Sequence, residues 1–290
     1  MSYLRHITLC NTYDLSRYRP FYVAGHRVGA VREDLFALVS RLDTHFEVRG
    51  RGLALSGRFA TPAARTAAMD EVTERLREEG WVRKVRHERY PVLTRWGAEP
   101  LLDVDRAVVA HFGFKAFGLH VNGFQRGPDG LLMWVGKRSL DRAIAPGQLD
   151  NLIAGGQPAG LSLTENLVKE AQEEAGLTPE QARRAVPVGA ITYLMENEHG
   201  LKPDTMFLYD LELPAEIVPR NTDGEVEQFF LWPLAQAAES VRTTDDWKFN
   251  CNLVVIDFLV RHGFLTPAHP DYLPILHGLR ASPEPHWPVT

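Results

Sequence analysis

The middle of the chain alternates apolar and polar residues at the two-residue period of a β-strand. Strands are predicted from this pattern over 118–124, 131–136, 186–195, 206–213 and 226–232. The first two flank the turn sequence Gly127-Pro128-Asp129-Gly130, which favours a hairpin. This part of the chain therefore predicts a sheet of several strands.

Helical spacing of apolar residues dominates the end of the chain. Helices are predicted over 233–241, 250–262 and 272–279. Helices that follow a run of strands and pack on them indicate an α/β protein. We expect an α/β/α sandwich with a mixed sheet over residues 116–290.

The first third of the chain mixes both patterns in shorter segments. Thr61 and Pro62 open a predicted helix that Gly80 ends, and Asp105 is the predicted cap of a short helix over 105–112. Short strands are predicted over 21–24, 28–31, 82–86 and 90–94. We therefore expect a smaller α+β domain over residues 1–115.

Composition narrows the class of protein. Apolar residues make up 44% and charged residues 24% of the chain, and the net charge of −5 argues against nucleic acid as a partner. The longest apolar stretch, 107–121, is too short and too polar to span a membrane. Two distant cysteines, Cys10 and Cys251, favour a reducing compartment. We expect a cytoplasmic monomer or homodimer without a membrane partner.

Three acidic residues form the most informative pattern. A glycine-rich segment over 155–160 precedes a predicted helix over 164–175, on which Glu170, Glu173 and Glu174 share one face. Carboxylates crowded in this way repel one another unless a cation lies between them. Hard oxygen ligands suit Mg²⁺ or Mn²⁺, so these glutamates are candidate metal ligands and catalytic residues, with a solvated acidic helix face as the alternative. Gly155 and Gly156 are predicted to let the backbone approach the metals and the substrate.

The spacing resembles the Nudix box, Gly-x5-Glu-x7-Arg-Glu-U-x-Glu-Glu-x-Gly-U, where U is apolar. The matching residues are Gly155, Glu170, Glu173, Glu174, Gly176 and Leu177. Leu161 replaces the first glutamate of the box and Lys169 replaces its arginine. The resemblance implies a Nudix-like fold and magnesium-dependent hydrolysis of a diphosphate bond.

Further motifs resemble one Nudix subgroup that carries an extra N-terminal domain and occurs beside thiamine pyrophosphokinase in some fungal proteins. These motifs lie at 155–160, 165–167, 209–214, 223–227 and 256–259. Members of the subgroup resemble hydrolases that convert damaged thiamine diphosphates, the oxo and oxy forms, to monophosphates. The resemblance thus implies a small-molecule diphosphate as the partner.

Other polar residues extend the predicted site. Glu225 is a candidate fourth ligand or general base. Lys137 and Arg138 end a predicted strand and are candidates for binding a phosphate oxygen, with a solvated strand end as the alternative. His120 is a candidate contact to a substrate ring, with a structural role in the core as the alternative.

Two other functions remain open. One is a pyrophosphatase for a nucleotide sugar or a dinucleotide. The other is a ligand-binding or regulatory module that has weak catalysis or none, which the changes at Leu161 and Lys169 suggest.

Overall fold

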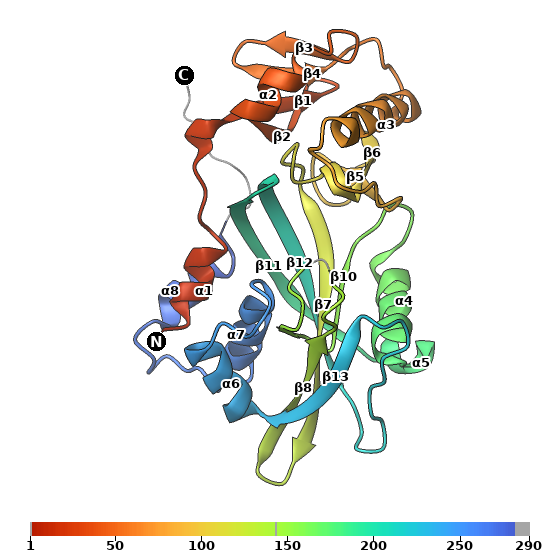
Figure 1. Cartoon of the computed structure of the whole chain (residues 1–290). Coiled ribbons are helices and arrows are strands. Elements are labelled where there is room, and N and C mark those ends of the chain that lie inside the picture. Colours follow the sequence, from red (N-terminus) through yellow and green to blue (C-terminus); the bar gives the residue numbers. More distant parts are fainter. Residues whose placement is uncertain (1, 143, 282–290) are drawn as a thin grey trace.

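In the computed structural model, residues 2–142 and 144–281 are described, and the largest element is a mixed seven-stranded sheet (Figure 1). Its main path runs in the order β11-β12-β7-β8-β13, while β10 pairs with β7 and β9 with β8. The strands are β7 (Ala116–Gly127), β8 (Gly130–Arg138), β9 (Leu149–Asp150), β10 (Ile153–Gly156), β11 (Val186–Asn197), β12 (Gly200–Glu212) and β13 (Val226–Pro233). All of the strands predicted in this region are confirmed, and β11 and β12 are longer than predicted.

Helices cover both faces of this sheet (Figure 1). One layer holds α4 (Leu163–Ala175) and α5 (Pro179–Ala182). The other holds α6 (Leu234–Thr243), α7 (Cys251–Arg261), α8 (Tyr272–Gly278) and α1 (Leu4–Leu9). Alternate residues of β8 point into the two layers, because Trp134 joins the apolar cluster under α4 whereas Met133 and Val135 join the one under α7. The expected α/β/α sandwich is therefore confirmed.

A smaller α+β unit lies at one end of the sandwich (Figure 1). One four-stranded sheet has the order β2-β1-β4-β3, and β5 pairs with β6. The elements are β1 (Tyr18–Val23), β2 (His26–Arg32), α2 (Glu33–Val39), β3 (Phe46–Arg49), β4 (Gly52–Leu55), α3 (Pro62–Glu78), β5 (Arg89–Val92) and β6 (Leu102–Asp105), with 3₁₀ turns at Leu15–Arg17 and Arg106–Val108. This unit has its own apolar core, which contains Phe21, Met69 and Phe112.

The first helix of the chain packs on the sandwich, although the small unit follows it in the sequence. Tyr3, which precedes α1, and Ile7 of α1 belong to the apolar cluster under α7, and the Tyr3 hydroxyl donates to the carbonyl of Ala238 at 3.2 Å. A domain boundary after residue 115 remains a prediction, and residues of α1 pack with the larger unit.

Two predicted elements of the first third are wrong in kind or length. The strand predicted over 82–86 is absent, since the backbone N–H groups of Arg86 and His87 donate to the Asp105 carboxylate rather than to a neighbouring strand. The helix predicted over 105–112 is only the 3₁₀ turn Arg106–Val108. Asp105 caps it as predicted, accepting from the backbone N–H of Ala107 at 2.9 Å.

Candidate functional site

The candidate site is built where β10 leads into α4. Ser162 and Glu165 form a capping box at the start of the helix, in which each side chain accepts a hydrogen bond from the other residue's backbone N–H. Gly176 ends the helix in the left-handed region, with a φ of 63°. Both ends agree with the predicted helix to within one residue.

Two amide side chains hold the loop between β10 and α4. Asn166 is fully buried and donates to the carbonyl of Gly156 at 2.8 Å, and Gln157 donates to the carbonyl of Leu161 at 2.6 Å. The side chain of Leu161 is 37% exposed, so only its backbone contributes to this support. Sequence reasoning missed Asn166 and Gln157, although both lie inside the motifs that carry the family resemblance.

The three glutamates of α4 point to different surroundings. Glu174 is only 6% exposed and accepts a hydrogen bond from the backbone N–H of Ala154 at 2.8 Å. Glu170 lies directly under Gly155, where an added Cβ would stand 2.5 Å from its carboxyl carbon. The Glu173 side chain is 46% exposed and pairs with Lys169 at 2.7 Å. Gly155 is therefore required for the approach of the loop to Glu170.

The buried carboxyls hold their protons more strongly than usual. Burial, and then the charges of Asp150, Glu170 and Glu225, raise the pKa of Glu174 well above its ordinary value. Burial likewise raises the pKa of Glu170, although Lys169 acts against it. The two carboxyls thus lack sufficient positive charge in their surroundings.

This donor set fits a hard divalent cation, which prefers carboxylate oxygens and would provide the missing charge. Glu170 and Glu174 approach the glycine loop from below, whereas Glu173 is turned away toward Lys169. Lys169 also contacts Glu170 at 3.2 Å, so its ammonium partly neutralises the carboxylate that a metal ion would neutralise. Use of Glu173 as a ligand requires its side chain to leave Lys169.

Glu225 is a further acidic residue whose charge acts on this site. It stands immediately before β13, pairs with Arg142 at 2.5 Å, and is near enough to raise the pKa of both Glu170 and Glu174. Its role as a ligand or general base stays a prediction.

Lys137 and Arg138 are engaged within the protein. Lys137 pairs with Glu227 at 3.0 Å across β8 and β13. Arg138 is buried, pairs with Asp150 at 2.6 Å, and also donates to the carbonyl of Ile144. The guanidinium of Arg138 therefore has two internal partners and serves the core rather than an exposed anion.

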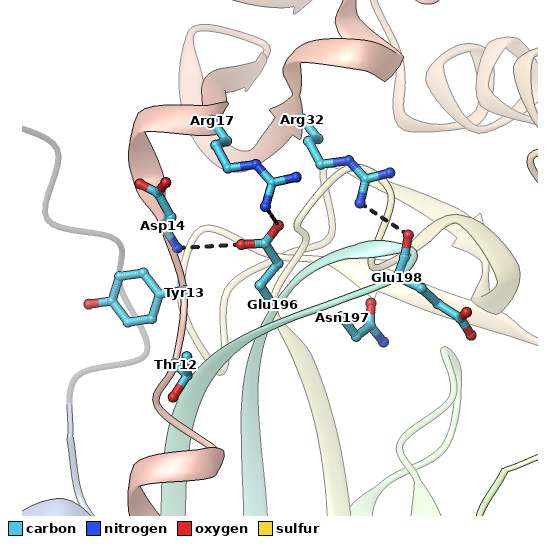
Figure 2. Close-up of a pocket in the computed structure, with 8 residues that line it drawn as sticks. All are labelled: Thr12, Tyr13, Asp14, Arg17, Arg32, Glu196, Asn197 and Glu198. Atoms are coloured by element: carbon cyan, nitrogen blue, oxygen red, sulfur yellow. Dashed lines mark hydrogen bonds and ion pairs between the residues drawn. The ribbon is translucent and has the colours of Figure 1, made fainter.

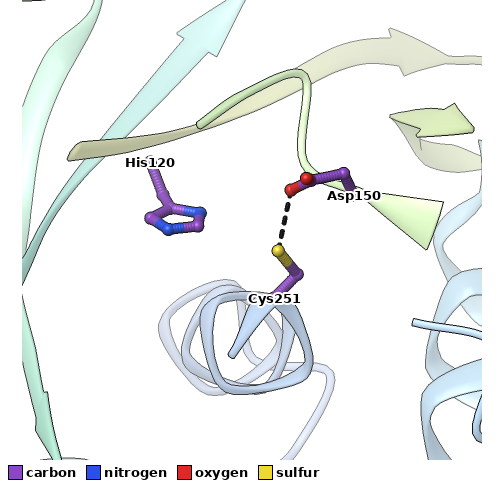
Figure 3. A group of neighbouring side chains, drawn as sticks. All are labelled: His120, Asp150 and Cys251. Carbon is purple, nitrogen blue, oxygen red and sulfur yellow. Dashed lines mark hydrogen bonds between the residues drawn. The ribbon is translucent and has the colours of Figure 1, made fainter. Parts of the chain in front are cut away.

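His120 lies on the opposite face of β7 from the α4 layer, in a buried group with Asp150 and Cys251 (Figure 3). Ligand atoms of these three residues lie within 4.8 Å of one another, and no other such group of three occurs in the part of the chain that is described. Cys251 donates to Asp150 at 2.7 Å, and burial lowers the pKa of His120 to about 4.

Charge argues against a metal in this buried group. Burial acts to raise the pKa of Asp150, but Lys248 and Arg138 hold it well below its ordinary value. The carboxylate therefore already has two cationic partners, so a metal ion would be repelled by both. His120 accordingly has a structural position, hydrogen-bonded to the Asn151 side chain at 2.9 Å.

A surface hollow of about 500 Å³ lies elsewhere, between the first residues of the chain and the turn joining β11 to β12 (Figure 2). Arg17 and Glu196 pair within it at 3.0 Å, and Arg32 donates to the carbonyl of Glu198. None of the predicted site residues lines this hollow. It is therefore separate from the acidic site.

Comparison with known proteins identifies the family. Nudix hydrolase 24, chloroplastic, of Arabidopsis thaliana is 38% identical over 282 residues, which cover 96% of this chain and 77% of that relative. The chain belongs to the Nudix hydrolase family. Nudix hydrolase 20, chloroplastic, of the same plant is 45% identical over 219 residues, which cover 76% of this chain but only 59% of that relative. This Nudix chain thus spans less than two thirds of the second relative.

Two further matches add less. Residues 2–116 match the family model described as "Domain of unknown function (DUF4743)". A solved Caenorhabditis elegans Ap4A hydrolase binary complex is 14% identical and matches 52% of this chain and 99% of its own, with a TM-score of 0.38. At that score the structural likeness adds nothing to the assignment, which the sequence relatives carry.

The expected cytoplasmic location is contradicted, because both Arabidopsis relatives are chloroplastic by name. For the membrane, only one structural finding applies. Over residues 2–142 and 144–281, no helix has the length and apolar character needed to cross a bilayer.

Proposed function

We propose that this Nudix chain hydrolyses the diphosphate bond of a small organic diphosphate with Mg²⁺ or Mn²⁺ held by Glu170, Glu173 and Glu174. The observation that carries the proposal is the pair of buried carboxyls, Glu170 and Glu174, packed under a glycine loop without enough neighbouring positive charge. Because the two plant relatives are named hydrolases, hydrolysis is the function that best fits this pair of buried carboxyls.

Each residue of the proposed site has a role that follows from its position. Glu170 and Glu174 would hold the cation, and Glu173 would join them once its side chain leaves Lys169. A bound divalent cation supplies charge to the diphosphate and acidifies water. Glu225, held by Arg142, takes the proton of the attacking water as general base. Gly155 and Gly156 keep side chains out of the path between the loop and the substrate.

For the substrate, we propose an oxidised thiamine diphosphate, which is converted to the monophosphate and inorganic phosphate. Support comes from the subgroup motifs, among them 155–160, 209–214 and 223–227. In this proposal residues 1–115 are an accessory domain and residues 116–290 the hydrolase domain, acting as a monomer or homodimer.

A phosphate-release screen tests the proposal. The full chain is incubated with Mg²⁺ or Mn²⁺ and a panel of oxothiamine diphosphate, thiamine diphosphate, nucleotide sugars and dinucleotides, with added phosphatase to reveal monophosphate products. Oxothiamine diphosphate is expected to give the highest kcat/KM. A preference for nucleotide sugars or dinucleotides would replace the substrate, and metal-dependent turnover of none would reject the hydrolase.

The matched variants are Glu174→Gln and Glu180→Gln. Loss of the buried ligand in Glu174→Gln is expected to lower kcat by about 100-fold or more, by analogy with the loss of one group that stabilises developing charge. Glu180 is an exposed glutamate of the neighbouring α5, so Glu180→Gln should turn over like the wild type. Equal rates in all three proteins would remove Glu174 from the chemistry.

A further inference from the structure

The small N-terminal unit touches the glycine loop of the hydrolase site through the β5–β6 hairpin. The backbone N–H of Ala159 donates to the carbonyl of Arg89 at 2.8 Å, which fixes β5 against the loop. An added Cβ at Gly156 would stand 1.6 Å from the Tyr90 hydroxyl oxygen. The Tyr90 hydroxyl therefore occupies the space that any side chain at position 156 would fill. In Figure 1 the hairpin lies beyond the ends of β7 and α4 that face the small unit.

No hydrogen bond joins the Tyr90 hydroxyl to another described residue. Tyr90 as a whole is 6% exposed, but its hydroxyl oxygen is not among the fully buried atoms that lack a partner, so this oxygen reaches solvent. A hydroxyl that reaches solvent beside Gly156 is accessible to a ligand, and a phenylalanine would give the same ring packing without this donor. A ligand placed beside Gly156 would provide the missing partner.

An arginine stands next to this tyrosine. Arg106 follows β6, its guanidinium lies 5.6 Å from the centre of the Tyr90 ring, and it pairs with Glu88 at 2.8 Å. Its side chain is 47% exposed, so it is accessible to a ligand in solution. Although burial acts to lower it, the pKa of Arg106 is raised by Tyr90, Glu88 and also Glu170. Glu170 thus makes the smallest of the contributions that stabilise the protonated Arg106.

These contacts connect the N-terminal unit with the glycine loop. Arg106 lies over Tyr90, and Tyr90 lies against Gly156. The preceding strand residue, Gly155, points instead to the opposite face of β10 and lies over Glu170. Arg138 and Lys137 are occupied by internal partners, and Lys169 is paired with Glu170 and Glu173. Arg106 is also paired, with Glu88, but its side chain is 47% exposed and it is the arginine that lies over the Tyr90 ring beside the glycine loop.

We propose that the N-terminal unit completes the hydrolase site, with the Tyr90 hydroxyl donating to phosphate oxygens of the diphosphate substrate and the Arg106 guanidinium pairing with them. Arginine binds phosphate with two parallel hydrogen bonds, and a tyrosine hydroxyl donates well to an anionic oxygen. Both residues recognise the diphosphate itself, so they act on any organic diphosphate that the site accepts. The inference rests on the proposed function.

Tyr90→Phe and Arg106→Gln test the inference, each with a matched control. Tyr90→Phe keeps the ring that packs on Gly156, so it is expected to fold. Tyr18→Phe removes the hydroxyl of a buried tyrosine on β1, away from the loop. Arg126→Gln removes another arginine that lies over a ring, Phe124 at 5.8 Å, and pairs with a glutamate.

Two readouts separate substrate binding from folding. The first is kcat and KM for magnesium-dependent phosphate release, and the second is the Kd of methylenediphosphonate with Mg²⁺, measured by calorimetry. Loss of a hydrogen bond to a charged group predicts that KM and Kd rise about tenfold or more in Arg106→Gln and about fivefold in Tyr90→Phe. Melting temperatures and both controls should stay near the wild type.

The outcomes distinguish this inference from the proposed function. Wild-type turnover with unchanged KM and Kd in both variants would overturn the inference and leave the hydrolase proposal intact. No wild-type turnover, but methylenediphosphonate binding that weakens in both variants, would reject the hydrolase and support the inference. Absence of both turnover and binding in the wild type would overturn the two together.

Discussion

At the scale of single residues, the site depends on the carboxyls of Glu170 and Glu174, which the fold itself buries. Glu174 and Glu170 face the loop, while Lys169 reaches Glu170 and Glu173 from the same helix. The sequence predicted the shared face of the glutamates because helical spacing is local. It did not predict the burial of Glu174 or its hydrogen bond from Ala154, since both depend on how β10 packs on α4.

Burial of Glu174 predicts a pH-dependent stability in the absence of metal. Its folded-state pKa lies above the unfolded value, so its contribution to stability is full below the unfolded pKa and is lost as pH rises through the folded pKa. In EDTA, the melting temperature of Glu174→Gln relative to the wild type should therefore increase between pH 5 and pH 8. Thermal unfolding at the two pH values measures this, and a difference that does not change with pH would contradict it.

At the scale of elements, α4 was predicted almost completely because residues at its two ends determine where it begins and ends. Ser162 and Glu165 form the box that starts it, and Gly176 supplies the left-handed residue that ends it. The strand predicted over 82–86 failed because its backbone donors bond to a distant carboxylate, that of Asp105. Local patterns thus predict an element only when its hydrogen-bond partners are also local or are supplied by a regular ladder.

The end of α4 provides a test at this scale. Gly176→Ala places a Cβ in the left-handed region and 2.9 Å from the carbonyl oxygen of Arg220. We expect a loss of about 1–2 kcal/mol in the free energy of unfolding, measured by urea denaturation. Gly57 has nothing within 4 Å of an added Cβ and no positive φ, so Gly57→Ala should change it by no more than about 0.5 kcal/mol. Equal losses in the two variants would show that the helix end is not strained.

At the scale of the whole molecule, the sequence predicted the α/β/α sandwich and the smaller α+β unit, and both are present. It could not predict that α1 packs against α7 and α8 or that Tyr90 contacts Gly156, because these contacts join segments far apart in the chain. The boundary after residue 115 stays a prediction. The cytoplasmic location was wrong, since it was inferred from composition and the two cysteines, whereas both plant relatives are chloroplastic by name.

The central claim is that α4 and the glycine loop together hold a divalent cation. Titration of the full chain with Mn²⁺, followed by electron paramagnetic resonance of the free ion, tests this directly. We expect saturable binding that Mg²⁺ displaces and that weakens by at least about tenfold in the Glu170→Gln/Glu174→Gln double variant, but not in Glu180→Gln. Identical Mn²⁺ binding curves for the wild type and the double variant would contradict the account.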